Sequence, residues 1–237
     1  MTERLYMDDA TLKRTPATVE AASEAGVVLD RTVFYARSGG QAGDVGVLRW
    51  DGGETPIADT IKGEGETILH VPGPGAVLPP VGARVEAEID WTRRHALMRM
   101  HTTLHLLCAV LPGIAVTGGA VNADRSRLDF DLPDPPAKEP IEEKLNALIA
   151  EDLRVRPEWV DESVLDTNPA LVRTLSVQPP RGTGRLRLVR IGADESPVDL
   201  QPCGGTHVSH TGEIGAVKIL KIENKGRQNR RIIVSLA

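Results

Sequence analysis

Hydrophobic positions recur with two different periods along the chain, and the change of period divides it in two. Up to about residue 89, β-branched and apolar residues form short runs punctuated by glycine, at 27–29, 32–35, 45–50, 67–71 and 84–89. Runs of this length predict strands, and several at this spacing predict a small barrel. The stretch 71–80 is rich in proline and glycine and predicts a loop. We therefore expect a Gly-rich β-barrel domain over residues 1–89.

Between Asp90 and Pro112 the hydrophobic period lengthens to that of a helix. Asp90 is a good N-cap residue, and Pro112-Gly113 would stop a helix that starts there. The apolar residues between them are three or four positions apart: Leu97, Met100, Leu104, Leu107 and Leu111. His101 and His105 each follow one of these residues by one position, which predicts that they lie beside the buried face, at the edge of a cleft.

The rest of the chain mixes strands with a second helix. Pro140 is expected to open this helix, because proline suits the first helical turn. Alternating patterns predict strands at 115–121, 125–131 and 185–191, and a C-terminal hairpin formed by 216–222 and 230–236. Residues 90–237 are therefore expected to form an α+β domain, an antiparallel sheet with helices, and the fold class of the whole chain is α+β.

The amino-acid composition indicates the cellular compartment in which we expect the protein. Of the 237 residues 41% are hydrophobic but only 3% aromatic, which is sufficient for a core of aliphatic side chains. Two cysteines, Cys108 and Cys203, are too few for a disulfide framework and indicate a reducing environment. No apolar run approaches the ~20 residues that cross a bilayer, and the first residues show no signal-peptide pattern. We expect a cytoplasmic protein with no membrane partner.

The charge of the chain is unevenly distributed. A net charge of −5 argues against bulk, non-specific binding to nucleic acid. Basic residues nevertheless gather near the C-terminus in a segment, here called the basic strip, whose only acid is Glu223: Lys218, Lys221, Lys225, Arg227, Arg230 and Arg231. A local basic strip on an acidic protein is typical of a partner whose phosphates touch one face only.

Two pairs of potential metal ligands share the same four-residue spacing. His101 and His105 would lie one turn apart on one face of a helix. Cys203 and His207 enclose two glycines, which let the backbone close around an ion. Three imidazoles and one thiolate are a plausible tetrahedral zinc set. Cys108 is a competing ligand, but a free cysteine is more often simply part of the core.

Other classes of zinc enzyme do not fit these spacings. A metalloprotease of the His-Glu-x-x-His type needs a glutamate after the first histidine, where this chain has Thr102. A nucleobase deaminase needs His-x-Glu and Pro-Cys-x-x-Cys, and Pro202-Cys203 is followed by no second cysteine at the required position. Both classes are excluded.

Five motifs in one order resemble a known family. They are 29–35 (LDRTVFY), 38–46 (SGGQAGDVG), His101-x-x-x-His105, 202–208 (PCGGTHV) with 211–215 (TGEIG), and 224–231 (NKGRQNRR). Together they resemble the editing domain of alanyl-tRNA synthetase and, more narrowly, its free-standing relatives, the AlaX trans-editing proteins. The resemblance runs from about residue 5 to the C-terminus, and the Gly-rich barrel is similar to that of the medium-length AlaX class. The chain has no synthetase catalytic core, so we expect a stand-alone protein.

The resemblance implies a reaction and the residues that perform it. The reaction is hydrolysis of the ester bond in mischarged Ser-tRNA(Ala), with Gly-tRNA(Ala) as a further candidate substrate and Ala-tRNA(Ala) spared. Thr32 matches a threonine that reads the serine hydroxyl, and Gln41 matches a glutamine near the editing pocket. The family's zinc positions are matched by His101, His105, Cys203 and His207.

Physical reasoning supports a hydroxyl-reading residue. A synthetase rejects serine poorly in a pocket made for alanine, so a second site must destroy the error. That site should contain a polar group that hydrogen-bonds the serine hydroxyl. When alanine occupies the site, this buried group has no partner, and binding of alanine is less favourable by ~1–3 kcal/mol. Thr32 has the right chemistry, and an ordinary β-branched strand residue is the alternative interpretation.

The role of the metal and of the basic residues leaves alternatives open. If all four ligands bind, zinc has no open position and organises the pocket; if His207 is distant, an open position could activate water. Arg93, Arg94 and the basic strip are expected to hold the acceptor stem or 3′ end of tRNA(Ala), with solvated charge as the alternative for the arginine pair. The alternative function is a non-catalytic, zinc-stabilised tRNA-binding module.

Overall fold

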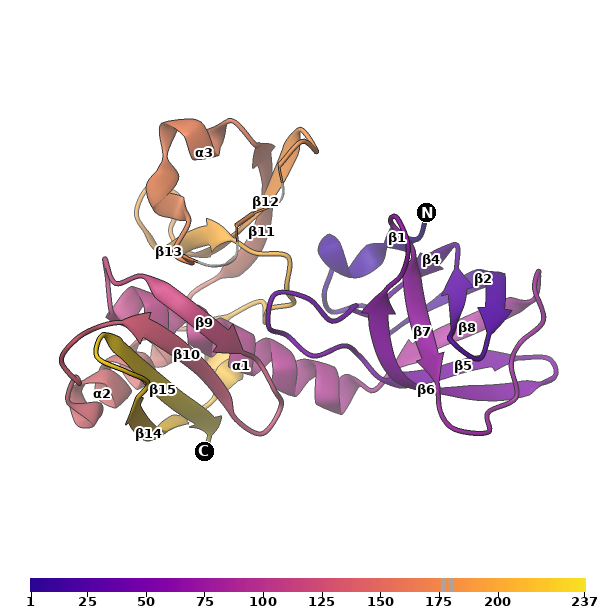
Figure 1. The fold of residues 1–237 in the computed structure, drawn as a ribbon, viewed down its shortest axis with the longest axis horizontal. Helices are drawn as coiled ribbons and strands as arrows, with labels where there is room; N and C mark the ends of the chain where they lie inside the picture. The colour runs from indigo at the N-terminus through magenta and orange to yellow at the C-terminus, as the bar shows by residue number, and fades with distance from the viewer. Residues whose placement is uncertain (176–177, 180) are drawn as a thin grey trace. The chain divides into compact units, whose positions relative to one another are not determined.

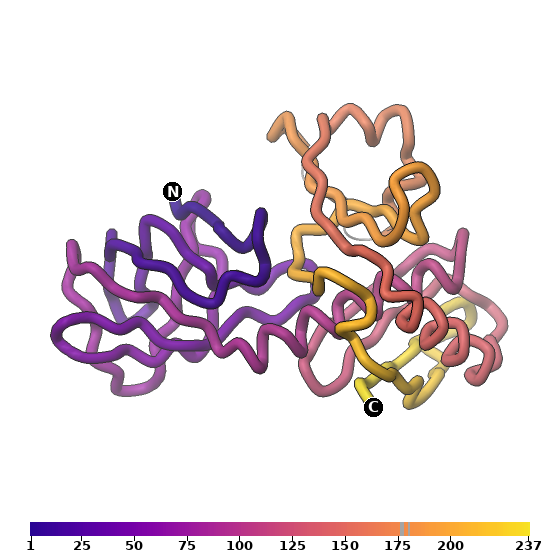
Figure 2. Tube along the Cα trace, turned by 180° about the vertical axis from the view of Figure 1, so that it is seen from behind, coloured from indigo at the N-terminus to yellow at the C-terminus, as the bar shows by residue number. Residues whose placement is uncertain are grey.

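The computed structural model of the chain describes residues 1–175, 178–179 and 181–237. It divides into two compact units, Met1–His95 and Ala96–Ala237. The division falls within the first long helix, α1 (Trp91–Val110). Figure 1 shows the ribbon of each unit, and Figure 2 shows the Cα trace from the opposite side.

Strands of the first unit form a closed barrel in which every neighbouring pair is antiparallel (Figure 1). The order around the barrel is β2 (Arg14–Ser23), β3 (Gly26–Leu29), β7 (Ile68–Pro72), β6 (Gly53–Lys62), β5 (Gly46–Trp50) and β8 (Arg84–Ile89). A parallel pair, β1 (Glu3–Arg4) and β4 (Arg31–Thr32), and a 3-10 turn, η1 (Leu5–Met7), complete the unit. The barrel encloses a core of aliphatic side chains and Phe34, as the composition predicts.

Two barrel strands were not apparent from the hydrophobic pattern. Pro16 lies inside β2 and Pro56 inside β6, and a proline within a run argues against a strand. Both strands also alternate around small or polar buried residues such as Thr15 and Thr55, which weakens the hydrophobic signal. The strand expected at 32–35 was predicted too long, because only its first residue lies in β4 while the next three are buried outside a ladder.

The second unit contains two antiparallel sheets. The four-stranded sheet has the order β14 (Val217–Asn224), β15 (Asn229–Leu236), β10 (Ser126–Asp131) and β9 (Val116–Ala120). Its strands are those predicted from the alternating patterns and the C-terminal hairpin, and Figure 1 shows β10 between β9 and β15. The three-stranded sheet consists of β11 (Val155–Asp161), β12 (Arg185–Gly192) and β13 (Pro197–Pro202), of which only β12 was predicted.

Helices complete the second unit and confirm the α+β class. They are α2 (Lys138–Ala150), α3 (Val164–Thr167) and the 3-10 turns η2 (Pro169–Leu171) and η3 (Thr211–Ile214). Pro140 lies in the first turn of α2, which begins two residues before it. The helix packs on β14 through Asn146, whose side-chain amide bonds both the N–H and the carbonyl of Val217. Figure 2 shows the C-terminal hairpin beside this helix.

Helix α1 is more buried than its apolar series suggests. Every residue from 100 to 108 is buried, so the helix has no solvent face in this stretch. His101 and His105 are only 8% and 5% exposed, which corrects the expectation that they lie at the edge of a cleft. Among the described residues, no helix combines the length and the apolar character needed to cross a membrane.

Candidate functional site

Four side chains of the second unit converge on one point. His101 and His105 come from successive turns of α1, and Cys203 and His207 come from the loop after β13. One ligand atom from each residue lies within 4.8 Å of the other three. The loop is held by its own backbone, since the N–H of Gly205 donates to Cys203 Sγ at 3.3 Å.

Two separations between these atoms are close to those of a tetrahedral metal site. Cys203 Sγ lies 3.4 Å from His207 Nε2 and 3.6 Å from His101 Nε2. Zinc bonds of about 2.3 Å to sulfur and about 2.0–2.1 Å to nitrogen give a ligand-to-ligand edge of about 3.5 Å in a tetrahedron. These two separations are close to that edge, and three imidazoles with one thiolate are donors that suit a divalent metal ion. Among the described residues these four form a group that could hold a metal ion.

The electrostatics of the cluster favour a charged thiolate. Burial raises the pKa of Cys203, but the neighbouring imidazoles of His101 and His207 outweigh it and bring the pKa well below the usual value. Burial lowers the pKa of His105, whereas Asp199 and Cys203 raise it, with a net pKa of about 10. The pKa of His207 lies well below its usual value because of burial and the two other histidines. A divalent cation binds the thiolate form of cysteine and the neutral form of histidine, so its binding here would release a proton from His105.

Residues behind the ligands were missed by the sequence interpretation. The carboxylate of Asp199 on β13 lies 2.9 Å from His105 Nδ1, and the amide of Gln201 donates to the same carboxylate at 2.8 Å. The hydroxyl of Thr102 lies 3.1 Å from His207 Nδ1. The available signal was the alternation of buried polar residues, Asp199 and Gln201, just before the Cys-Gly-Gly-Thr-His motif.

Cys108 does not belong to the cluster. Its side chain is buried, and burial raises the pKa of its thiol to about 12. A thiol in that state is neutral and a poor ligand. The prediction that Cys108 is a core residue is confirmed.

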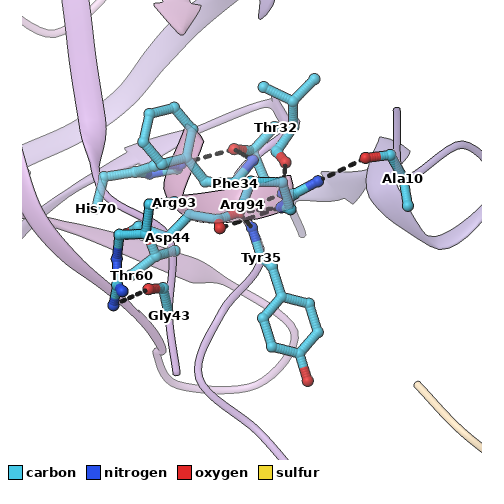
Figure 3. A network of polar contacts seen from close by, with 11 residues as sticks. Ala10, Thr32, Phe34, Tyr35, Gly43, Asp44, Thr60, His70, Arg93 and Arg94 are labelled. Carbon is cyan, nitrogen blue, oxygen red and sulfur yellow. Dashed lines mark hydrogen bonds and ion pairs between the residues drawn. The ribbon is translucent and has the colours of Figure 1, made fainter. Parts of the chain in front are cut away.

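Thr32 lies in the barrel unit with its hydroxyl already engaged (Figure 3). Its Oγ1 lies 2.7 Å from His70 Nε2 and accepts the N–H of Phe34 at 3.0 Å. His70 Nδ1 is 2.9 Å from the carbonyl of Val27, which can only accept, so Nδ1 carries the proton and Nε2 accepts the threonine hydrogen. Burial lowers the pKa of His70 to about 4, in agreement with a neutral ring.

The Gly-rich run 38–46 explains the buried position of Gln41. The backbones of Ser38 and Gln41 bond each other in both directions, across two glycines with positive φ, 55° and 83°. A Cβ on Gly46 would lie 2.1 Å from the carbonyl of Glu88, so only glycine lets β5 approach β8 this closely. The run therefore shapes the barrel, and Gln41 is buried within it.

The two arginines at the start of α1, Arg93 and Arg94, lie in different environments. Arg94 is fully buried, and each guanidinium nitrogen donates to the carboxylate of Asp44 or to the carbonyls of Ala10 and Val33 (Figure 3). This corrects the expectation that Arg94 contacts tRNA, because its charge is used inside the unit. Arg93 is half-buried and donates to the carbonyl of Gly43 at 3.2 Å.

The basic strip is also only partly available to a partner. Arg230 is buried and donates to the carbonyls of Pro133, Gly226 and Asn229, which corrects the expectation that it contacts phosphates. Arg231 is half-buried and bonds Asp129 with two nitrogens. The remaining members of the strip are exposed: Lys218, Lys221, Lys225 and Arg227. Glu223 pairs with two of them, Lys221 at 2.9 Å and Lys225 at 3.4 Å.

Comparison with known proteins assigns the class. Residues 186–233, which include Cys203 and His207, match the family described as threonyl and alanyl tRNA synthetase second additional domain. Residues 7–93 match the family described as tRNA synthetases class II (A). The alanine–tRNA ligase of Pyrobaculum arsenaticum is 38% identical over 232 residues, which are 94% of this chain but 25% of the ligase. The chain thus spans about a quarter of the length of such ligases.

Relatives of matching length define the particular family. The alanyl-tRNA editing protein AlaX-M of Methanosarcina mazei is 38% identical over 248 residues, which cover 100% of this chain and 97% of that protein. The AlaX-M protein of Methanosarcina barkeri is 37% identical over 245 residues, with 100% and 99% covered. The chain therefore belongs to the AlaX-M family of alanyl-tRNA editing proteins, as the motifs predict.

Proposed function

We propose that this chain, an aminoacyl-tRNA hydrolase of the alanyl-tRNA editing family, removes serine from mischarged Ser-tRNA(Ala) and spares Ala-tRNA(Ala). Gly-tRNA(Ala) is a further substrate of the same proposal. The observation that carries it is the convergence of His101, His105, Cys203 and His207 in a chain that matches AlaX-M relatives over their whole length. We place this activity in the cytoplasm, where mischarged tRNA enters translation.

Zinc is the proposed metal of the four-residue cluster. The mixed imidazole and thiolate donors suit zinc, and the separations between ligand atoms support a closed tetrahedral site. When bound, zinc supplies a fixed positive charge at the junction of α1 with the loop after β13. Because all four positions are taken by protein, we assign the cluster the task of organising the pocket, while the side chains and backbone around it orient the ester.

Thr32 is the residue to which we assign discrimination of serine. Its hydroxyl hydrogen is held by His70, so the orientation of Oγ1 is fixed and one lone pair remains after the bond from Phe34. A serine hydroxyl could donate to that lone pair, whereas alanine offers no donor. Gln41, which is buried in the same unit, is proposed as a second residue of the barrel that contributes to editing.

The partner is tRNA, with the acceptor stem and 3′ end as the proposed contact. The exposed lysines and Arg227 of the hairpin β14–β15, together with Arg93, supply the positive charge that phosphates require. Lys221 and Lys225 would exchange their exposed pairing with Glu223 for phosphate contacts, at little cost because surface ion pairs are weak.

The test is deacylation of three substrates, Ser-, Gly- and Ala-tRNA(Ala), by the purified protein. We expect release of serine, with alanine retained. Cys203→Ala, which removes one ligand, should abolish the activity while the fold is checked by circular dichroism. Binding of tRNA(Ala) without release of any amino acid would refute the hydrolase proposal and leave the non-catalytic tRNA-binding module.

A further inference from the structure

A carboxylate is buried directly behind the metal ligands. Asp199 on β13 is 1% exposed. Its Oδ2 lies 2.9 Å from His105 Nδ1 and accepts a hydrogen bond from Gln201 Nε2 at 2.8 Å. Removing a carboxylate from water is unfavourable unless its charge is compensated, so the burial of Asp199 needs a physical reason.

A long ion pair compensates this charge only weakly. Arg173 pairs with Asp199, but its Nη2 lies 4.0 Å from Oδ1, too far for a hydrogen bond. Oδ1 itself has no hydrogen-bond partner among the described residues, and neither does Nε of Arg173. The hydrogen bonds of the Asp199 side chain are therefore made by Oδ2, with the imidazole of His105 and the side-chain amide of Gln201.

The hydrogen bond determines which nitrogen of His105 is available. An ionised carboxylate only accepts, so His105 Nδ1 carries the proton and Nε2 is left as the ligating atom. His207 is arranged in the same way by a different group. The hydroxyl of Thr102 donates to the carbonyl of Met98 at 2.9 Å, so it receives the Nδ1 proton of His207 and leaves Nε2 facing Cys203 Sγ.

We propose that Asp199 is a positioning residue of the metal centre, which holds His105 in the tautomer and ring orientation that binds the ion. Gln201 keeps the carboxylate in place by donating to the same oxygen. The negative charge of Asp199 also makes His105 Nε2 a stronger metal ligand, as carboxylates hydrogen-bonded to ligating histidines do in general. The inference concerns metal binding and rests on the zinc part of the proposed function.

Metal affinity tests the proposal without reference to activity. Wild type, Asp199→Asn and Asp199→Ala would be stripped of metal and titrated with zinc against a chromophoric chelator. We expect Asp199→Ala to bind zinc about 10- to 100-fold more weakly and the isosteric Asp199→Asn to lie between it and wild type. Visible spectra with cobalt(II) in place of zinc should show altered ligand-field bands for the alanine variant, because the His105 ring is no longer held.

A matched control separates positioning from general stability. Glu158 lies on β11, the edge strand opposite β13 in the same three-stranded sheet, and pairs with Arg190 of the central strand β12, with 2.6 Å between Oε1 and Nε. Glu158→Gln should lower stability without changing zinc affinity or the cobalt spectrum. Wild-type affinity and spectrum in Asp199→Asn and Asp199→Ala would overturn the inference, and if the alanine variant does not fold, the asparagine variant decides alone. Failure of the wild type to bind zinc would instead overturn the metal assignment.

Discussion

The buried histidine of the barrel predicts a pH dependence of stability. His70 on β7 has no exposed surface, bonds Val27 and Thr32 through its two ring nitrogens, and lies edge-on to Phe34 with ring centroids 5.1 Å apart. Burial lowers its pKa to about 4, although the bond to the carbonyl of Val27 acts in the opposite direction. Protonation would add an uncompensated charge and remove the acceptor of the threonine hydrogen.

The size of this change in folding stability follows from the difference between the pKa values of His70 in the folded and unfolded states. Above the unfolded value of 6.5 the ring is neutral in both states, and the stability it contributes is fully present. As the pH falls from 6.5 towards 4 the unfolded state binds the proton first, so stability is lost progressively. Lowering the pKa from 6.5 to about 4 corresponds to a loss of about 3 kcal/mol of folding stability in total, of which about 2 kcal/mol falls between about pH 7 and pH 5.

Urea unfolding of wild type and His70→Gln at a series of pH values measures this contribution. The glutamine variant should be less stable at neutral pH, because its hydrogen bonds are imperfect, but its stability should fall less on acidification. Taking the difference between the two proteins removes the contribution of the metal cluster, which they share. Parallel loss of stability in both proteins between about pH 7 and pH 5 would refute a neutral, buried His70.

Three substitutions, with a fourth as a control, test the sites separately. Cys203→Ala should lose bound zinc, because one of four ligands is removed, as measured by elemental analysis of the purified protein. Thr32→Val should keep the fold but reduce the preference for serine over alanine by about tenfold or more, measured as the ratio of deacylation rates. Arg94→Met should destabilise the barrel by about 3–5 kcal/mol in urea unfolding, because it leaves Asp44 buried without its partner. Arg93→Ala, the matched control one residue earlier, should leave stability nearly unchanged and weaken tRNA binding, most clearly at low salt.

Each of these expectations has an outcome that contradicts it. Full zinc occupancy in Cys203→Ala would remove that ligand from the assignment. An unchanged rate ratio in Thr32→Val would exclude Thr32 from the recognition of serine. Equal stability of Arg94→Met and wild type would mean that the buried pair with Asp44 does not hold the barrel.

Local patterns in the sequence identified the four residues whose potential ligand atoms converge in the structure. Two ligands four positions apart on a helix, and two more around a pair of glycines, are set by spacing within a few residues, which a sequence displays directly. Helix α1, strands such as β12 and the C-terminal hairpin were predicted for the same reason, because their hydrophobic periods are regular over whole elements. That the two pairs of ligands meet could only be hypothesised.

Only the tertiary structure decided which charged residues are used inside the protein. Arg94 looks like a surface arginine in the sequence, and its burial depends on Asp44, 50 residues away. Asp199 acquires its contact with His105 across 94 residues, when β13 is brought to α1. The strands β2 and β6 likewise take their place through pairing with distant partners despite their prolines. These contacts join residues that are far apart in the sequence and meet only when the chain folds. A pattern of neighbouring residues therefore cannot predict them.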